Sequence, residues 1–578
     1  MPKLTAADYE AARALLRRYW RYADFRPGQW EAIRAVLTGQ DVLAIFPTGG
    51  GKSVCYQLPA LLLEGLTLVV SPLIALMEDQ VARLRARGIP AAFVHSALAP
   101  SATEQHWINA AHGAYRLLYL TPEQLTTHRF AALSPRLRIS LLAVDEAHCV
   151  SDWGPAFRPA YLELSQVRAQ LGHPPMLALT ATATPSVRVD IVQKLGLRTP
   201  CVIAVGFDRP NLVWSVFETS HKAERVEAVV RTIAGAGILY CATRRSAERW
   251  AQQLARWRIP AVCYHSGLTM AERRTAHQAW LEDRARVMVA TRAFGLGVDR
   301  ADARFVVHTA LPPSLEVYYQ EAGRAGRDGH KAHAVLLFEA ADIALAQALL
   351  QQTYPSTETV SRIYEVACSL AQVAIGSRPQ HPIALDIARI AQLVGTSPSA
   401  VRRALELLMR QGLWEPVALR AQDVLLRFCA PAATLRRFAH QNPNTRLGHF
   451  VETLLRSIPA EAFHTWWPVS LRYLERQTGL PRERLLRGLD FLRERALLGW
   501  LSAAQGQLVR FKEARAARLT FDDRLLRQAQ QQAETQLEDM IRYARTPGCR
   551  RHFLRTYFGE AAPAHCHSCD HCLGGQPF

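Results

Sequence analysis

A short apolar run followed by a glycine-rich loop is the feature that most constrains this chain. Val42–Phe46 reads as a buried strand, and the loop Thr48-Gly49-Gly50-Gly51-Lys52-Ser53 comes directly before an apolar helical stretch. Glycines let backbone N–H groups approach phosphate oxygens, while the lysine neutralises the terminal phosphates and the serine hydroxyl binds Mg²⁺. The pattern predicts a phosphate-binding P-loop, and the alternative is a glycine-rich turn with a surface lysine. The residues expected to hold the nucleotide are Thr48, Gly49, Gly50, Gly51, Lys52 and Ser53, with Ser53 also on Mg²⁺.

A pair of carboxylates follows a second apolar run. Leu141–Val144 reads as a buried strand, and Asp145-Glu146 stands at its carboxyl end. An open α/β sheet binds its ligands at that edge, so Asp145 is expected in the Mg²⁺ shell and Glu146 is expected to orient the attacking water. By itself the acidic pair is also what a strand leaving the core looks like. Together with the P-loop it predicts an NTP hydrolase.

Charge and composition narrow the class of partner and the location. The chain has 578 residues, a net charge of +19 and 49% hydrophobic residues. A basic excess is expected of a protein that binds a polyanion such as nucleic acid. No apolar run approaches the ~18 residues that a membrane helix needs, and the first residues lack a signal-peptide pattern. A cytoplasmic protein without a membrane anchor is expected.

Strand-like runs alternate with helical stretches over the first 350 residues, which predicts an α/β fold with two parallel-sheet lobes. The second lobe has no P-loop, but it carries Gln320, Arg324 and Arg327 in a glycine-bearing segment. Arginines at this spacing can reach a phosphate held by the other lobe and stabilise charge in the transition state. The alternative is a solvated basic helix face. The expected strands are Val42–Phe46, Leu66–Val70, Leu117–Leu120, Leu141–Val144 and Met176–Leu179, then Ile238–Cys241, Ala261–Tyr264, Val287–Ala290, Phe305–His308 and Ala334–Phe338.

The order of these motifs resembles that of superfamily-2 helicases, and closely the RecQ family of DNA helicases. The resemblance runs almost continuously over residues 10–345. Its most specific pieces are Phe25-Arg26-Pro27-Gly28-Gln29, Ser71-Pro72-Leu73, Thr121-Pro122-Glu123, Asp145-Glu146-Ala147-His148, Thr180-Ala181-Thr182-Ala183, Phe207-Asp208-Arg209-Pro210-Asn211-Leu212 and Tyr264-His265-Ser266-Gly267.

The resemblance implies two RecA-like lobes and assigns further residues to the nucleotide. Tyr22 and Arg26 would sandwich the adenine, Gln29 would read its edge, and Asp299 would also lie at the nucleotide. Arg324 and Arg327 would close on the γ-phosphate from the second lobe. Residues with an implied catalytic role are Lys52, Asp145, Glu146, Gln320, Arg324 and Arg327.

An aromatic loop at Trp153–Pro159 looks like the loop through which the family senses single-stranded DNA. Trp153 and Phe157 offer stacking faces worth ~1–3 kcal/mol per base, and Arg158 adds a cation. Gly154 and Pro155 favour a loop over the alternative, in which both aromatic residues belong to the core. Trp153, Phe157 and Arg158 are therefore predicted to bind DNA.

Two segments of the C-terminal part align at an offset of 84 residues, from Gly395 and from Gly479. Each reads as helix, glycine turn, amphipathic helix and then a strand pair, which resembles a winged helix. Arg403 and Arg487 on the second helices are predicted to contact duplex DNA, with one wing as a strand-separating pin. A winged helix that binds protein is the alternative.

Four cysteines cluster at the end of the chain as Cys549-x₁₆-Cys566-x₂-Cys569-x₂-Cys572. Two overlapping Cys-x₂-Cys steps and one distant cysteine match a closed structural Zn²⁺ site with four thiolates. His565, His567 and His571 are expected to be surface residues. The module resembles the RecQ zinc module but follows the winged-helix segments, and whether it folds back on the second lobe stays open here.

The sequence thus predicts five parts: lobe 1 (1–205), lobe 2 (206–352), two winged-helix-like domains (353–460 and 461–535) and a zinc module (536–578). The implied activity is that of an ATP-dependent DNA helicase using ATP, Mg²⁺ and Zn²⁺. It would move 3′-to-5′ on single-stranded DNA, act on forked or duplex DNA and serve repair or recombination. An RNA helicase and an ATP-gated DNA clamp without unwinding are the alternatives.

Overall fold

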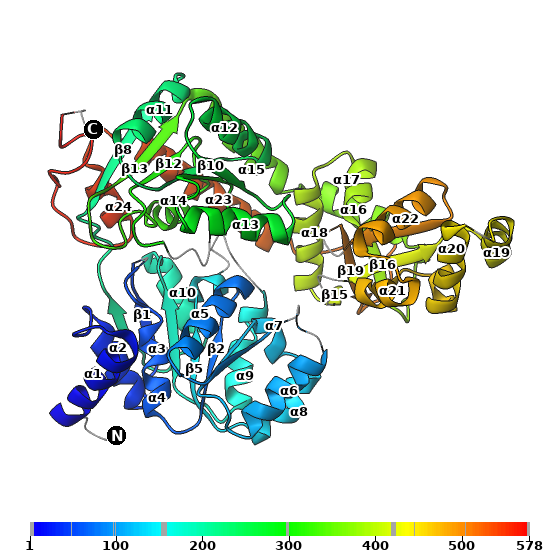
Figure 1. Cartoon of the computed structure of the whole chain (residues 1–578), viewed down its shortest axis with the longest axis horizontal. Coiled ribbons are helices and arrows are strands. Elements are labelled where there is room, and N and C mark those ends of the chain that lie inside the picture. The colour runs from blue at the N-terminus through cyan, green and yellow to red at the C-terminus, as the bar shows by residue number, and fades with distance from the viewer. Residues whose placement is uncertain are drawn as a thin grey trace. The chain divides into compact units, whose positions relative to one another are not determined.

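The computed structural model describes residues 5–47, 49–95, 98, 100–151, 159–295, 300–417, 423–443, 445–502 and 505–574. The chain forms two compact units, one from residues 1–347 together with 531–578 and the other from residues 348–530. Figure 1 shows the two sheets of the first unit and the smaller elements of the second. None of the helices among the described residues has the length and apolar character that crossing a bilayer requires.

Lobe 1 is built on a seven-stranded sheet with the order β3-β4-β2-β5-β6-β1-β7, and every pair in it is parallel. Its strands are β1 (Val42–Ile45), β2 (Leu66–Val70), β3 (Ala91–Val94), β4 (Leu117–Leu120), β5 (Ile139–Val144), β6 (Met176–Thr180) and β7 (Cys201–Ala204). Its helices are α1 (Ala6–Trp20), α2 (Gln29–Leu37), α3 (Val54–Gln57), α4 (Pro59–Leu62), α5 (Ile74–Ala86), α6 (Pro100–Ala111), α7 (Pro122–Leu125), α8 (His128–Leu133), α9 (Leu164–Gln170) and α10 (Pro185–Lys194), with 3₁₀ turns η1 (Ser134–Arg136), η2 (Ala147–Val150) and η3 (Pro159–Tyr161).

The central strands of lobe 1 are apolar on both faces because helices cover both sides of a parallel sheet. Strands β1, β2, β4 and β6 are buried at every position. The two edge strands were not predicted, and the residues of β7 are alternately half-buried and exposed although all four are apolar. Since β1 and β5 are parallel members of one sheet, their carboxyl ends place the P-loop and Asp145-Glu146 at the same edge.

Lobe 2 has a six-stranded parallel sheet with the order β10-β11-β9-β12-β13-β8. All five predicted strands are present, and β8 at the edge is additional. The strands are β8 (Leu212–Glu218), β9 (Gly237–Tyr240), β10 (Ala261–Tyr264), β11 (Val287–Ala290), β12 (Phe305–His308) and β13 (Ala332–Phe338). The helices are α11 (Lys222–Thr232), α12 (Arg244–Arg256), α13 (Met270–Leu281), α14 (Leu315–Ala322) and α15 (Ala340–Thr353).

The C-terminal segment returns to lobe 2, which answers the question that the sequence left open. Helices α23 (Arg524–Arg545) and α24 (Arg550–Tyr557) contribute Tyr543, Leu554 and Phe558 to the core that also holds the lobe 2 strands. Asp570 accepts a hydrogen bond from Val216 N (2.9 Å), and its own N–H donates to Trp214 O (3.0 Å). These two bonds satisfy backbone groups along the outer edge of β8, so residues 348–530 are an insertion between lobe 2 and its last segment.

The inserted unit shows the predicted repeat. Its helices α18 and α22 begin at residues 398 and 482, a difference of 84, and β15 and β18 begin at 414 and 498, again 84. The strands are β14 (Ile383–Asp386), β15 (Trp414–Val417), β16 (Asp423–Phe428), β17 (Trp467–Ser470), β18 (Leu498–Ser502) and β19 (Gly506–Phe511). The helices are α16 (Thr357–Leu370), α17 (Ile387–Val394), α18 (Pro398–Arg410), α19 (Ala432–Gln441), α20 (Arg446–Ser457), α21 (Leu471–Thr478) and α22 (Arg482–Glu494), with η4 (Ala460–Phe463).

The two repeats exchange their third strands, so the prediction of a strand pair within each repeat is wrong. Strand β19 lies between β14 and β15, and β16 lies between β17 and β18, all antiparallel. The residue pattern of β16 explains how this is tolerated. Leu426 faces the helices of the second repeat, while Leu425 packs with Leu501 and Leu508 in a small core that joins the two sheets. Apolar residues on both faces therefore suit a strand that lies between the repeats.

Candidate nucleotide site between two lobes, and a four-cysteine metal site

The P-loop is held open by hydrogen bonds from its own lobe. Gly50 N donates to Pro47 O (2.9 Å), and Gln29 Nε2 donates to Gly51 O (3.0 Å). Gly49 and Gly51 have φ of 82° and 79°, a region that residues with a Cβ rarely adopt. A Cβ on Gly51 would also lie 2.4 Å from Gln29 Nε2. Glycine is thus required at these positions by both conformation and space.

The acidic pair lies where the sequence predicts, at the end of β5 and under the P-loop. Glu146 Oε1 lies 3.7 Å from Lys52 Nζ, and Asp145 Oδ1 accepts the Glu146 N–H at 3.0 Å. Tyr161 Oη donates a buried hydrogen bond to Asp145 O (3.0 Å), which holds the backbone of Asp145 in place. Glu146 has φ 49°, an unusual value for a residue with a side chain and one that tends to occur at functional sites. The three charged groups predicted to act on phosphate therefore share one site.

Burial splits the acid strengths of the two carboxyls. Desolvation, and then the neighbouring Glu146 charge, raise the pKa of Asp145 to about 6. Desolvation acts on Glu146 as well, but Lys52, His148 and Arg324 together hold the pKa of Glu146 below its ordinary value. A divalent cation beside Asp145 would reverse its shift by supplying the missing positive charge. The donor set therefore fits Mg²⁺ at Asp145, with the Ser53 hydroxyl as the second predicted ligand.

The adenine-binding residues predicted from the resemblance lie around the same loop. The Arg26 guanidinium lies 5.7 Å from the centre of the Tyr22 ring, and Tyr22 is exposed. Arg26 Nη1 donates to Gly49 O, and Arg26 N donates to Gln29 Oε1 (2.9 Å). Gln29 is buried and bonds both to Arg26 and to the P-loop. The residues predicted to bind the base are therefore hydrogen-bonded directly to the backbone of the P-loop.

Residues of lobe 2 reach this site. A Cβ on Gly49 would lie 3.3 Å from Arg327 Cγ, so the Arg327 side chain lies directly against the P-loop. Arg324 is buried, and its positive charge helps to lower the pKa of Glu146. Gln320 Nε2 donates to Thr182 Oγ1 of lobe 1 (2.8 Å). Gln320, Arg324 and Arg327, which were predicted from one glycine-bearing segment, thus each lie close to a different residue of lobe 1.

A row of hydrogen-bonded polar groups runs from His148, which lies beside Glu146, to Gln320. His148 Nδ1 lies 3.3 Å from Glu146 Oε2 and 2.9 Å from Thr180 Oγ1. The Thr180 hydroxyl donates its one hydrogen to Thr182 O (3.2 Å), so His148 must be the donor to Thr180. Burial lowers the pKa of His148. His148, Thr180 and Thr182 are absent from the residues assigned a role by sequence, although both of their motifs are recognisable there.

Five residues predicted for the site lie outside the described part of the chain: Thr48, Asp299, Trp153, Phe157 and Arg158. Their roles stay predictions.

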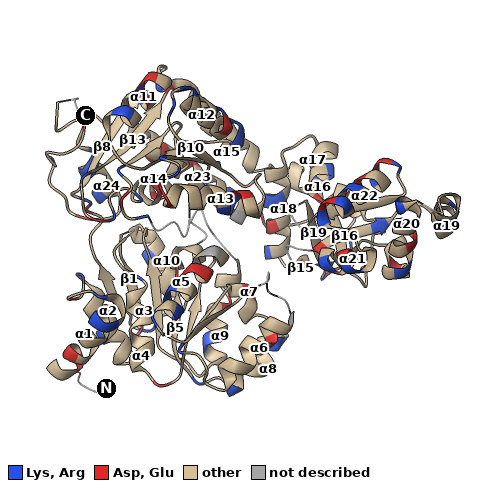
Figure 2. Ribbon diagram, viewed as in Figure 1, with Lys and Arg blue, Asp and Glu red and all other residues tan. Residues whose placement is uncertain are grey.

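Two predicted DNA contacts in the inserted unit differ from one another. The Arg403 guanidinium donates to Tyr354 Oη (2.9 Å) and pairs with Glu406 (3.1 Å), so its groups are already engaged. Arg487 on α22 is exposed and forms a surface pair with Glu483, among several other basic residues of that helix (Figure 2).

The four C-terminal cysteines converge on one point. Their Sγ atoms all lie within 4.8 Å of one another, and the Cys566–Cys572 and Cys549–Cys569 pairs are both 3.9 Å apart. A tetrahedral zinc ion with Zn–S bonds of about 2.3 Å sets its sulfurs about 3.8 Å apart. Cys549 Sγ also accepts the His552 N–H (3.4 Å) at the start of α24. The cluster fits Zn²⁺, and His565, His567 and His571 are exposed as predicted.

Three protein families match separate segments of the chain. The family of DEAD/DEAH box helicases matches residues 26–190, the helicase conserved C-terminal domain matches 221–329, and the RecQ zinc-binding family matches 513–573. A P-loop lobe with an acidic pair, faced by arginines of a second parallel-sheet lobe, defines the class as two-lobed helicases of superfamily 2.

The ATP-dependent DNA helicase RecQ of Bacillus subtilis is 44% identical over 345 residues, which are 59% of this chain and 58% of that protein. RecQ of Pasteurella multocida is 44% identical over 345 residues, 59% of this chain and 54% of that protein. The probable ATP-dependent DNA helicase RecS of Bacillus subtilis is 39% identical over 359 residues, 61% of this chain and 71% of that protein. The chain belongs to the RecQ family, and it spans little more than half the length of the two RecQ proteins.

Proposed function

We propose that this protein is an ATP-dependent DNA helicase that moves 3′-to-5′ on single-stranded DNA. The observation that carries the proposal is the approach of Arg327 to Gly49, because it assembles one phosphate site from two lobes. A site divided in this way couples hydrolysis to movement of one lobe against the other. The similarity to the named RecQ and RecS helicases supports DNA as the track.

Each residue of the site has a defined task in this proposal. Lys52 and the P-loop N–H groups bind the terminal phosphates, and Arg26 with Tyr22 binds the base. Glu146 is kept ionised mainly by Lys52, with help from Arg324, so it can orient the attacking water and accept its proton. Arg324 and Arg327 stabilise the charge that develops on the transferred group. Mg²⁺, when bound by Ser53 and Asp145, neutralises phosphate charge.

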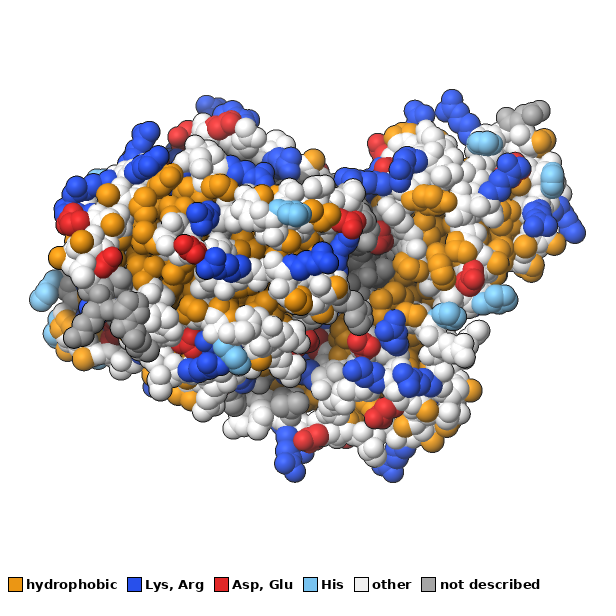
Figure 3. Space-filling model, turned by 90° about the horizontal axis from the view of Figure 1, so that it is seen from below, with side chains coloured by type: hydrophobic (Ala, Val, Ile, Leu, Met, Phe, Trp, Pro, Cys, Tyr) orange, Lys and Arg blue, Asp and Glu red, His pale blue; other side chains and the backbone are white. Residues whose placement is uncertain are grey.

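The net charge of +19 supports binding to a polyanion. On the face seen in Figure 3 the basic side chains are spread over the surface among acidic ones. Binding is then expected to follow the phosphate backbone at several points, and the exposed basic face of α22 is our choice for a duplex contact. A cytoplasmic location and a role in repair or recombination belong to the same proposal.

Strand displacement tests the proposal, with matched 3′-tailed, 5′-tailed and blunt DNA substrates in the presence and absence of ATP. We expect ATP-dependent release from the 3′-tailed substrate alone, and none from the Lys52→Ala variant. Equal stimulation of ATP hydrolysis by single-stranded RNA would instead support an RNA helicase.

The strand exchange favours one second candidate, an ATP-gated DNA clamp. Among the described residues neither repeat pairs its own last two strands, so neither forms the hairpin wing that was predicted as a separating pin. Retention on a forked duplex that depends on ATP, without release of a strand from any substrate, would support the clamp.

A further inference from the structure

A four-residue segment at the end of α24 lies where three parts of the ATPase meet. This segment, Tyr557–Glu560, belongs to the zinc module and follows the helix that Cys549 caps. It contacts lobe 1, the linker between the lobes, and helix α14 of lobe 2. The activity site derived above uses none of its residues.

The contact with lobe 1 is made through Arg188 of α10. Arg188 Nη2 donates to Phe558 O (2.7 Å), and Arg188 Nε donates to Ala183 O (3.2 Å). Ala183 directly follows Thr182, which accepts the hydrogen bond from Gln320. Gly559 has φ 81°, and a Cβ there would lie 2.9 Å from Pro185 Cγ. One guanidinium thus ties the zinc module to the loop that contacts lobe 2.

The contact with the linker is made by a stacked pair of rings and a partly buried hydrogen bond. The rings of Phe558 and Phe207 lie 4.3 Å apart and are inclined by 9°. Glu560 Oε1 accepts the Phe207 N–H at 2.7 Å, and Glu560 Oε2 accepts from Arg555 Nε at 2.9 Å. The next linker residue, Asp208, forms ion pairs with Arg551 and Arg555 of α24.

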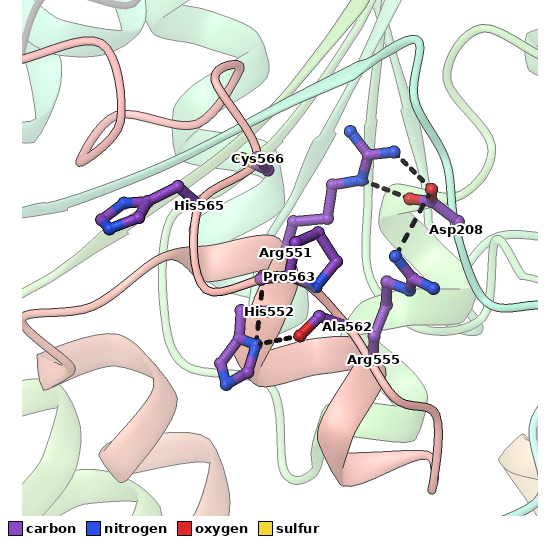
Figure 4. Close-up of a pocket in the computed structure, with 8 residues that line it drawn as sticks. All are labelled: Asp208, Arg551, His552, Arg555, Ala562, Pro563, His565 and Cys566. Atoms are coloured by element: carbon purple, nitrogen blue, oxygen red, sulfur yellow. Dashed lines mark hydrogen bonds and ion pairs between the residues drawn. The ribbon is translucent and has the colours of Figure 1, made fainter.

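Figure 4 shows this pairing in a pocket of about 180 Å³ beside Cys566, where both arginines point toward Asp208. The linker that must bend when the lobes move is therefore bound to the zinc module at two consecutive residues.

The contact with lobe 2 is made on the helix that leads to the arginines. Tyr557 Oη donates to Glu316 Oε1 (2.7 Å), and the Phe558 ring packs edge-on against Tyr319 at 5.1 Å. Tyr319 Oη in turn donates to Phe207 O (2.9 Å). Glu316 and Tyr319 lie on α14, which also carries Gln320 and ends just before Arg324.

We propose that Arg188 and Glu560 are positioning residues for the interlobe ATPase site, and that Tyr557–Glu560 is the pivot on which the lobes close. Arg188 donates hydrogen bonds to the carbonyl of Ala183 in the Thr182 loop and to the carbonyl of Phe558 in the pivot, and together these bonds fix the distance between the two segments. Glu560 fixes the linker against the same pivot. Closure then brings Arg324 and Arg327 to the phosphates along a constrained path. This role rests on the proposed ATPase activity.

A purely structural role makes a different prediction. If these contacts only stabilise the zinc module, their loss should lower zinc content or thermal stability, and activity should fall in proportion. If they position the lobes, kcat should fall while zinc content, thermal midpoint and the KM for ATP stay close to those of the wild type. ATP binds mainly through lobe 1, whereas the transition state needs both lobes.

The test compares Arg188→Gln and Arg188→Lys in the full-length zinc-loaded protein. Arg188→Gln should lower DNA-stimulated kcat by up to about a hundredfold, the loss that a misplacement of a catalytic group by about 1 Å can cause. Arg188→Lys keeps one donor and should recover part of this loss. Glu560→Gln keeps an oxygen for the Phe207 N–H and should be milder than Glu560→Ala. Arg231→Gln, which breaks a surface pair with Glu227 on α11, is the matched control.

A second measurement does not depend on turnover. Hydrogen exchange of α14 and the segment to Arg327 should slow when a non-hydrolysable ATP analogue binds the wild type, and should slow much less in Arg188→Gln. Unchanged kcat in Arg188→Gln, or equal slowing of exchange in both proteins, would overturn the pivot, as would a loss of activity that follows zinc loss. Wild type that neither binds the analogue nor hydrolyses ATP would instead overturn the proposed function.

Discussion

Arg327 of lobe 2 lies against Gly49 of the P-loop, so that any side chain on Gly49 would meet its Cγ at 3.3 Å. Gly49 also has φ 82°. The residue therefore answers two demands, one from the backbone of its own loop and one from the opposite lobe. The contact with Arg327 bears on the proposed catalysis, and a variant can separate it from the requirement for a positive φ.

The Gly49→Ala variant should lose most of its ATP hydrolysis. The left-handed backbone strain is about 1–2 kcal/mol, and the Arg327 side chain must shift by a few tenths of an ångström to make room for the methyl group, which misplaces its charge relative to the transition state. Gly39→Ala is the control because Gly39 has φ 79° with nothing within 4 Å of its would-be Cβ. Gly39→Ala should show similar strain in thermal unfolding but normal kcat. Equal kcat in the two variants would show that Arg327 does not act at Gly49.

The Asp145→Asn variant should be inactive and yet more stable than the wild type at neutral pH. Burial, followed by the Glu146 charge, raises the pKa of Asp145 from 3.8 to about 6. The folded state therefore binds a proton more tightly than the unfolded chain, and stability falls as pH rises through that interval. The thermal midpoint of the variant should exceed that of the wild type by a few degrees above pH 6 and match it near pH 4.

Mg²⁺ provides the check on this interpretation. Added Mg²⁺ should raise the midpoint of the wild type above pH 6, because it compensates the Asp145 charge, and should leave Asp145→Asn unchanged. If Asp145→Asn were less stable than the wild type at every pH, the inference that the buried Asp145 charge destabilises the folded state would be contradicted.

Metal analysis should find one zinc per chain, and Cys569→Ser should lose it. Cys569 is fully buried among three other thiolates, so a hydroxyl in its place removes a ligand without a substitute. Loss of zinc should also destabilise α24, since Cys549 caps its first turn. Cys429→Ser is the control, being an exposed cysteine outside the cluster. A folded wild type free of metal would contradict the zinc assignment.

The Val509→Asp substitution in β19 should open the first repeat, although Val509 lies about a hundred residues beyond β15 in sequence. Val509 is fully buried between β14 and β15 in the core of α16–α18. Hydrogen exchange should accelerate in β14 and β15 and much less in β17 and β18. Leu426→Asp in β16 should show the reverse, since Leu426 belongs to the other core. If Val509→Asp instead accelerated exchange in β17 and β18, and Leu426→Asp in β14 and β15, each repeat would keep its own third strand.

Replacement of Trp153 by Ala should preserve basal ATP hydrolysis and weaken its stimulation by single-stranded DNA. Stacking on an aromatic ring is worth ~1–3 kcal/mol per base, so the affinity for DNA should fall by roughly ten- to hundredfold. The measurement is ATP turnover against DNA concentration. Unchanged stimulation would return Trp153 to the core.

Much of the fold and site could be predicted because their chemistry is carried by neighbouring residues. The P-loop, Asp145-Glu146 and the cysteine steps are contiguous or closely spaced, and most of the predicted apolar runs of both lobes are buried on both faces. The edge strands β3, β7 and β8 were not predicted, although β3 and β7 are wholly apolar, because a short apolar run by itself does not distinguish a strand from a buried helix segment. Arg403 was chosen for its position on a helix, and only its contacts with Tyr354 and Glu406 show that it is engaged.

The sequence by itself determined the P-loop motif, the acidic pair and the cysteine steps, since each set lies within one short segment. The tertiary structure alone decided three pairings: Arg327 with Gly49, Arg188 with Phe558, and the strands β16 and β19 with the opposite repeats. Backbone hydrogen bonds carry no residue identity, so an apolar strand pattern specifies a strand without naming its partner. Contacts to carbonyl oxygens, such as that of Arg188 with Phe558, likewise cannot be predicted from residue identity, and here they connect the zinc module to lobe 1.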